Sequence, residues 1–237
     1  MTLCHFIIDF TYNIRYCRSV IKNDTVSQMN GGYVLPKETF FNLPVEKQNN
    51  LIEAAQKEFS RAPLNEASIS NILKHAQIPR GSFYQYFTDK EDAFFYLIEL
   101  ATIKSRDQFL DYLEEVNGDL VATFTKLFKQ LLLEFKKEEN RSFFRNIFLN
   151  MNYKTEYFFA KGMELEDSSA ELIKVTDMKA LNAKDTEDVI RISKILRTVT
   201  IWHLIEHFAK ERSYEESLIF FEKDLGLLKQ GFYKNNE

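Results

Sequence analysis

The chain has 237 residues, a net charge of −4 and 45% hydrophobic residues, with only 7 glycines and 4 prolines. This length fits one or two domains, and so few turn-forming residues favour long helices over many strands. The acidic balance argues against a protein that coats nucleic acid indiscriminately, but not against one that touches DNA through a small patch. The two cysteines, Cys4 and Cys17, match no metal-site or disulfide spacing. We therefore expect a cytoplasmic protein without a metal or other cofactor.

Residues 1–35 are expected to be a poorly defined N-terminal extension. Their most apolar stretch, residues 3–10, lacks the basic start and the cleavage site of a signal peptide, and no stretch of the chain has the length and apolarity of a transmembrane helix. No membrane partner is expected. Met29 is followed by the flexible run Asn30-Gly31-Gly32, and translation from Met29 is an alternative that stays open.

Four helices are predicted in the first half of the chain. The first lies between Asn42, a candidate cap, and about Arg61, since a proline follows at position 63. Ser68 is expected to cap a short second helix, and residues 80–87 form a third. Thr88, with a glutamate three residues later, fits a capping box that starts a long helix to about residue 115.

The remainder also shows helical periodicity and no strand alternation of useful length. Helices are expected over about 119–137, 141–152, 155–165, 185–210 and 213–232, with 166–184 partly loop. The predicted fold is all-α, with a three-helix helix-turn-helix domain at 36–90 followed by a helical ligand-sensing and dimerisation domain at 91–237.

Two short helices joined by a tight turn are typical of a helix-turn-helix, whose second helix lies in the major groove of DNA. Arginine and glutamine on that helix can read guanine and adenine, and tyrosine hydroxyls and a lysine can hold phosphates. A glycine lets the backbone approach the duplex closely, and Phe83 and Phe87, four residues apart, should face inward. The expected DNA contacts are Ser68, Arg80, Gly81, Ser82, Tyr84, Gln85, Tyr86 and Lys90.

The run from Gly81 to Glu91 reads Gly-Ser-Phe-Tyr-x-Tyr-Phe-x-x-Lys-Glu and resembles the signature of the TetR family of bacterial regulators. The resemblance covers Leu43 to Ile98 and departs at Gln77, where the family usually has glycine. It implies an all-helical homodimer whose last two long helices pair with those of the partner. It also implies a C-terminal domain that binds a small molecule, whose arrival shifts the DNA-binding heads apart.

Aromatic residues and methionines are densest between residues 143 and 163, and this stretch could form core, subunit interface or a pocket for an apolar or aromatic effector. The sequence leaves these three readings open. The residues expected to line a pocket are Phe128, Phe144, Phe148, Met151, Tyr157, Phe158, Trp202 and His203.

The segment from His203 to His207 spells H-x-x-E-H, the inverted zinc-peptidase motif, whose two histidines share one helix face. Few residues follow it to supply a third ligand, so a zinc hydrolase is the lesser alternative, beside a helical interaction module that does not bind DNA. The main prediction is a non-enzymatic, sequence-specific transcriptional regulator. We expect a ligand-released repressor that binds a pseudo-palindromic operator as a homodimer.

Overall fold

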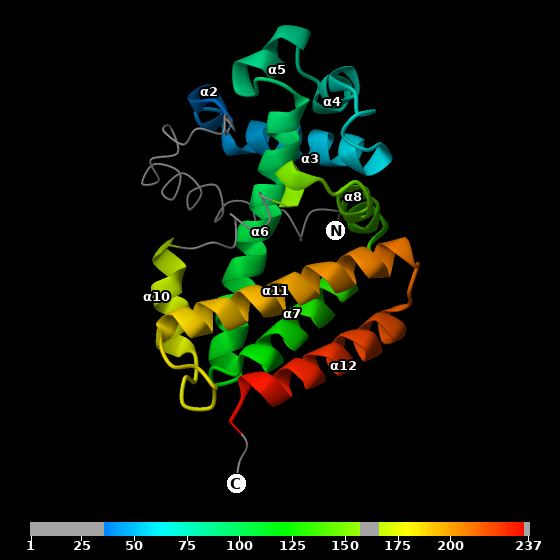
Figure 1. The fold of residues 1–237 in the computed structure, drawn as a ribbon. Coiled ribbons are helices and arrows are strands. Elements are labelled where there is room, and N and C mark those ends of the chain that lie inside the picture. The colour runs from blue at the N-terminus through cyan, green and yellow to red at the C-terminus, as the bar shows by residue number, and fades with distance from the viewer. Residues whose placement is uncertain (1–35, 157–165, 235–237) are drawn as a thin grey trace. The chain divides into compact units, whose positions relative to one another are not determined.

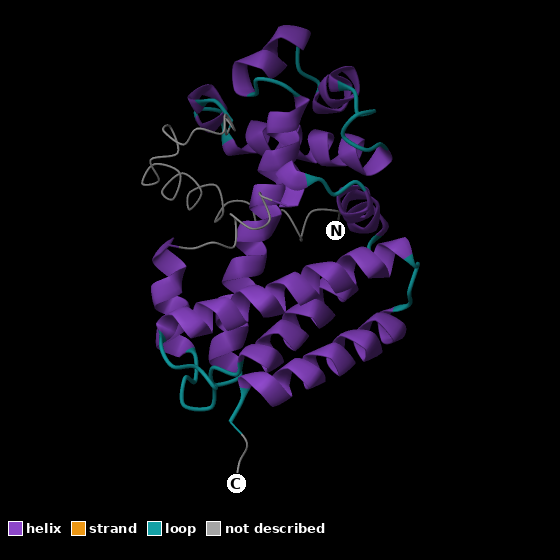
Figure 2. Ribbon diagram, viewed as in Figure 1, coloured by secondary structure: helices purple, strands orange, loops and turns teal. Residues whose placement is uncertain are grey.

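The computed structural model describes residues 36–156 and 166–234. In these ranges the regular structure is helical (Figure 2), apart from one isolated β-bridge between Leu181 and Tyr233. The all-α prediction is therefore confirmed. None of the described helices is long and apolar enough to cross a membrane. The extension at 1–35, with its alternative start at Met29, lies outside the described residues.

The chain divides into two compact units, one made of residues 1–104 and 138–159 and the other of residues 105–137 and 160–237. Helix α6 (Lys90–Glu115) contributes residues to both. The domain boundary expected after Lys90 stays a prediction, because the division into compact units follows packing rather than function.

The first unit is held together by an aromatic core. Phe59 packs edge-on against Phe94 with ring centroids 5.1 Å apart, and both side chains are buried. Asn146 donates its side-chain amide to the Phe59 carbonyl at 2.8 Å, which fixes the later helix α8 against α3. Besides the start of α6, the helices of this unit are α2 (Glu38–Phe41), α3 (Val45–Arg61), α4 (Ile69–Ala76), α5 (Arg80–Tyr86) and α8 (Glu138–Leu149).

The second unit contains α7 (Leu120–Glu134), α10 (Glu166–Val175), α11 (Thr186–Ala209) and α12 (Tyr214–Phe232). Helices α7, α11 and α12 lie side by side (Figure 1). Their core includes Phe128 stacked on Phe221 with ring centroids 4.0 Å apart. Helix α12 begins with a capping box, since the Ser213 hydroxyl and the Glu216 carboxylate each accept the other residue's backbone N–H.

Several predicted helix ends need correction. The capping box expected at Thr88 is wrong, because the helix begins at Lys90 and Asp89 accepts the Asp92 N–H at 3.0 Å. Asp92 in turn accepts the Thr88 N–H at 2.8 Å. Asn42 ends α2 rather than starting α3, which begins after Pro44. Of the helix expected at 155–165, residues 153–156 are helical and residues 157–165 lie outside the described ranges.

Candidate nucleic-acid interface

The turn between α4 and α5 is built on one residue with left-handed backbone. Gln77 ends α4 with φ 55° and ψ 39°, and the Ile78 N–H returns to the Leu73 carbonyl at 3.2 Å. Pro79 then precedes α5 with φ −60°, a value its ring favours. Left-handed backbone normally favours glycine, so glutamine at this position carries a conformational cost.

Helix α5 is oriented by two buried phenylalanines. Phe83 and Phe87 have no exposed surface, which confirms that they face inward, and their ring centroids are 5.4 Å apart. The opposite face carries most of the expected DNA-reading side chains. Tyr84 is 50% exposed. Arg80, Gly81 and Gln85 are also exposed, while Ser82 and Tyr86 are half-buried.

Gly81 lies in the first turn of α5 with open space around it. A Cβ built on Gly81 would meet no atom within 4 Å. The free chain therefore does not need a glycine here for packing, and the helical backbone does not need one for conformation. The close approach to DNA expected at Gly81 stays a prediction.

The N-terminus of α4 is capped by a buried carboxylate, not by the serine expected to do so. The Ser68 side chain makes no capping hydrogen bond. Instead Glu58, fully buried on α3, accepts the Ser68 N–H at 2.7 Å and the Asn71 side-chain amide at 3.1 Å. Arg61 also donates to Glu58, at 2.7 Å. Burial raises the pKa of Glu58, but these hydrogen bonds outweigh it and leave the pKa below its ordinary value.

Lys90 already has partners within the free chain. Its ammonium donates to the carbonyls of Asn65 and Ala67 at 2.9 and 3.0 Å. These carbonyls lie in the loop before α4, so Lys90 holds that loop against the start of α6. An ammonium has three hydrogens, so one remains for the phosphate contact expected of it.

Lys37 and Thr39 belong to this site, but sequence reasoning missed them. The Lys37 ammonium and the Thr39 hydroxyl donate to carbonyls at the end of α5. Their separation from α5 by more than forty residues leaves no local sequence signal.

Among residues 68–87 there is no acidic side chain, so the cations Lys74 and Arg80 have no opposing charge within this segment of the sequence.

The residues expected to line an effector pocket fall in different places. Phe128 and His203 meet in the second unit, with ring centroids 6.3 Å apart, and Trp202 on the same helix is 57% exposed. Phe144 and Phe148 are buried and stack on each other in the first unit, with Met151 half-buried. Tyr157 and Phe158 lie outside the described residues. The expected pocket stays a prediction.

The H-x-x-E-H side chains are held by separate partners. Buried His203 places its Nε2 2.9 Å from Asp224, and His207 places its Nδ1 2.8 Å from the Ser217 hydroxyl. Glu206 pairs with Lys210 and with Arg212. In residues 36–156 and 166–234 no three histidine, cysteine or acidic side chains are grouped so that they could hold a metal ion. This arrangement gives the zinc reading no support.

Two family models match the chain and together cover more than half of it. Residues 51–97 match the bacterial regulatory proteins of the tetR family, and residues 119–232 match the tetracyclin repressor-like C-terminal domain. The chain belongs to the TetR family. The first match includes α4 and α5, and the second runs from α7 to α12 and includes Phe128 and His203.

The chain matches only part of the length of two curated relatives. The chain is 27% identical over 96 residues to the HTH-type transcriptional regulator AcrR of Shigella flexneri, covering 40% of this chain and 45% of AcrR. It is 43% identical over 54 residues to the uncharacterized HTH-type transcriptional regulator YdgC of Bacillus subtilis, covering 23% and 28%. The chain thus spans less than half the length of either relative.

A solved structure resembles this chain over a longer stretch. The crystal structure of FadR from Bacillus subtilis in complex with stearoyl-CoA matches with a TM-score of 0.54 and 16% identity, covering 77% of this chain and 98% of FadR. At this identity the likeness shows the fold alone.

Proposed function

We propose that this TetR-family chain is a cytoplasmic, non-enzymatic transcriptional repressor that binds a pseudo-palindromic operator as a homodimer and leaves it when a small effector binds. The observation that carries the proposal is the face of α5. Two buried phenylalanines fix that helix, and Arg80, Tyr84 and Gln85 stay exposed on it. Arginine and glutamine are the side chains that read guanine and adenine in the major groove.

The proposed DNA contacts divide into base readers and phosphate holders. Arg80 and Gln85 read bases, and Gly81 lets the helix approach the duplex. Tyr84, Lys90 and the half-buried hydroxyl of Ser68 hold phosphates, together with the half-buried Ser82 and Tyr86. We keep residues 36–90 as the DNA-binding domain and residues 91–237 as the sensing and dimerisation domain.

A second copy of the chain is the proposed occupant of the exposed apolar face on the last two helices. On α11, Trp202 is 57% exposed and Ile195, seven residues earlier, is 44% exposed. On α12, Ile219 and Leu227 are 65% and 63% exposed, and they lie eight residues apart. Such spacing puts large apolar side chains along one face of each helix, as a helix-pairing interface requires.

The effector is proposed to be an apolar or aromatic compound bound within residues 91–237. Phe128, Phe221 and His203 form a buried aromatic cluster there, and the His203 Nδ1 is buried with no hydrogen-bond partner. Ligand binding can shift the population of two dimer states only by its differential affinity for them. Helix α6 contributes to both compact units, so we propose that it transmits this preference.

The test is fluorescence anisotropy of the purified protein with labelled DNA from beside its own gene, at two salt concentrations and with unrelated DNA as control. We expect preferred, salt-sensitive binding to the flanking DNA. Arg80→Ala should remove about 1–3 kcal/mol of that preference. Arg141→Ala, which removes an exposed arginine on α8 of the same unit, should not. The proposal would be overturned if the wild-type protein bound the flanking DNA no better than the unrelated DNA, and also bound a duplex selected from random sequence no better than the unrelated DNA.

A further inference from the structure

The C-terminal end of the recognition helix α5 is fully capped. An α-helix leaves its last four carbonyls without partners inside the helix. In α5 these belong to Phe83, Tyr84, Gln85 and Tyr86. The first is satisfied locally, because the Phe87 N–H donates to the Phe83 carbonyl at 2.9 Å. The other three are satisfied from a distant part of the chain.

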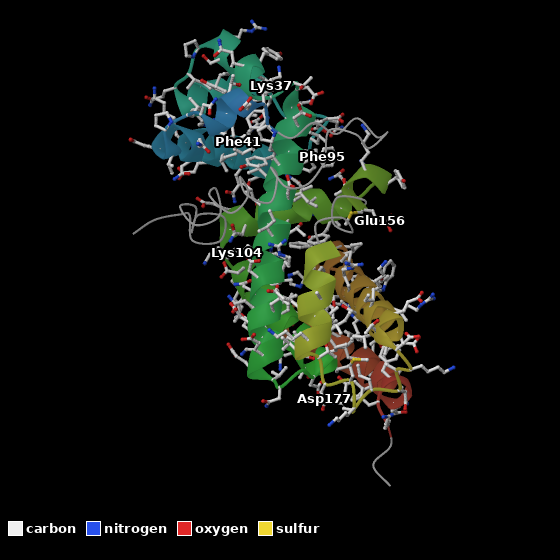
Figure 3. All side chains as sticks on the ribbon, turned by 90° about the vertical axis from the view of Figure 1, so that its left-hand side faces the viewer. Lys37, Phe41, Phe95, Lys104, Glu156 and Asp177 are labelled. Carbon is white, nitrogen blue, oxygen red and sulfur yellow. The ribbon has the colours of Figure 1, made fainter. Side chains whose placement is uncertain are left out.

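Those three carbonyls take their hydrogen bonds from the start of α2. The Lys37 ammonium donates to the Tyr84 carbonyl at 2.8 Å, and the Lys37 backbone N–H donates to the Tyr86 carbonyl, also at 2.8 Å. The Thr39 hydroxyl donates to the Gln85 carbonyl between them. Figure 3 labels Lys37 in this part of the first unit. The Lys37 charge also stands at the negative end of the helix dipole, where a cation is stabilising.

Apolar packing fixes α2 in the place from which it can donate. Phe40 is fully buried, with its ring centroid 5.4 Å from that of Phe87 and 5.5 Å from that of Tyr96. Phe87 follows directly after α5, and Tyr96 lies on α6. The short helix α2 is therefore anchored by its phenylalanine beside the helix end that its polar side chains cap.

The recognition helix depends on such outside support because of its length. It has seven residues, too few to be stable in isolation. Base reading by Arg80 and Gln85 requires side chains held to within about half an ångström of their productive positions. The two buried phenylalanines fix which face of α5 points outward, but hydrogen bonds to its final carbonyls fix its axial position and keep its last turn closed.

We propose that Lys37 and Thr39 are positioning residues for DNA readout, and that α2 is a functional part of the DNA-binding head although it precedes the residues 51–97 of the family match. This inference rests on the proposed DNA-binding function. It gives a role to side chains that do not themselves read bases. It also predicts that removing the Lys37 or Thr39 side chain reduces the sequence preference of the protein rather than its general affinity for DNA.

The test compares four variants with the wild-type protein. Thr39→Val removes the hydroxyl but keeps the side-chain shape and charge, and Thr39→Ser restores the donor. Lys37→Met removes the ammonium, and Lys47→Met removes an exposed lysine from α3 of the same unit as a charge-matched control. Each is measured for its affinity ratio between a duplex selected from random sequence by the wild-type protein and an unrelated duplex. Hydrogen exchange of the α5 amides, with α4 as reference, is followed in the absence of DNA.

We expect Thr39→Val and Lys37→Met each to lower the affinity ratio roughly threefold to tenfold, the effect of about one hydrogen bond. Exchange should quicken in α5 but not in α4, while Thr39→Ser and Lys47→Met should behave like the wild type. An unchanged ratio in Thr39→Val would overturn the inference. A loss of correctly folded protein with the ratio intact would also overturn it, because it indicates a structural role only.

Failure of the proposed function gives a different pattern. The wild-type protein would then show no preference between the two duplexes, whatever happens to α5 in the variants. Slower or unchanged exchange of the α5 amides in Thr39→Val would in that case still contradict the capping role. The two measurements therefore separate a wrong function from a wrong role for α2.

Discussion

The carboxylate of Glu58 accepts the backbone N–H of Ser68 at 2.7 Å and so caps α4 from the neighbouring helix. It is a fully buried side chain that replaces the expected serine cap. A carboxylate also carries negative charge, which the positive end of the α4 dipole favours. One residue of α3 thus fixes both the start of α4 and, through Arg61, its own last turn.

Replacing Glu58 should destabilise the first unit. Glu58→Gln keeps the shape but removes the charge and gives the Ser68 N–H and Arg61 a poorer acceptor, at an expected cost of about 1–3 kcal/mol. The midpoint of thermal unfolding, followed by circular dichroism at pH 7, should fall by several degrees. Glu46→Gln, an exposed carboxylate on the same helix, serves as the control. Equal midpoints for the two variants would show that the buried hydrogen bonds contribute no net stability.

The same residue predicts a pH dependence. The folded-state pKa of Glu58 is lowered below its ordinary value of 4.5, so its stabilisation is present above that pH. The stabilisation is lost as the pH falls through the folded-state pKa. The difference in unfolding midpoint between the wild type and Glu58→Gln should therefore be largest near neutral pH and shrink below pH 4.5. A difference that grows on acidification would mean that the sign of the shift is wrong.

Gln77 offers a gain in stability. Its φ of 55° lies in the left-handed region, where a residue with a Cβ is destabilised by about 1–2 kcal/mol relative to glycine. Glycine also loses more entropy on folding, so Gln77→Gly should gain a net of roughly 0.5–1 kcal/mol. Gln77→Val should lose stability, because a branched Cβ is least tolerated there. Thermal midpoints of the two variants in reverse order would contradict this account of the turn.

Gly81 separates stability from DNA binding. Gly81→Ala meets no atom of the chain and exchanges glycine for a better helix former, so the free protein should gain about 0.5–1 kcal/mol. If α5 approaches the duplex closely at this residue, operator affinity should fall at the same time. A more stable Gly81→Ala protein with full affinity would remove Gly81 from the contact surface.

Local sequence patterns predicted many of the helices and their buried faces, whereas other features depend on contacts between residues far apart in the sequence. Phe83 and Phe87 lie four residues apart, and that spacing alone placed them on one buried face. The capping box formed by Ser213 and Glu216 also follows from residues close together in the sequence. At the start of α6, however, two overlapping patterns compete: threonine with glutamate at 88 and 91, and aspartate with aspartate at 89 and 92. The second pattern forms, which moves the cap, and with it the helix start, by one residue.

The positioning groups of the DNA-binding head have no local signature. Glu58 reaches Ser68 across a loop, ten residues along the chain. Lys37 reaches the Tyr84 carbonyl across 47 residues. Side-chain donors and acceptors that satisfy a distant helix end depend on tertiary packing, which periodicity does not encode. The sequence therefore predicted which face of α5 is buried, but not what holds the helix in place.

Lys90 holds the loop before α4, and we propose that it also contacts a DNA phosphate; its replacement can distinguish these two roles. Lys90→Met removes two hydrogen bonds to the Asn65 and Ala67 carbonyls, so unfolding without DNA should become easier by about 1–2 kcal/mol. If the remaining N–H also holds a phosphate, all DNA sequences should bind more weakly and the slope of log affinity against log salt should flatten by about one. Lys74→Met, an exposed lysine on α4, should leave the stability unchanged. A loss of stability with an unchanged salt slope would assign Lys90 to the loop alone and take it out of the phosphate contacts.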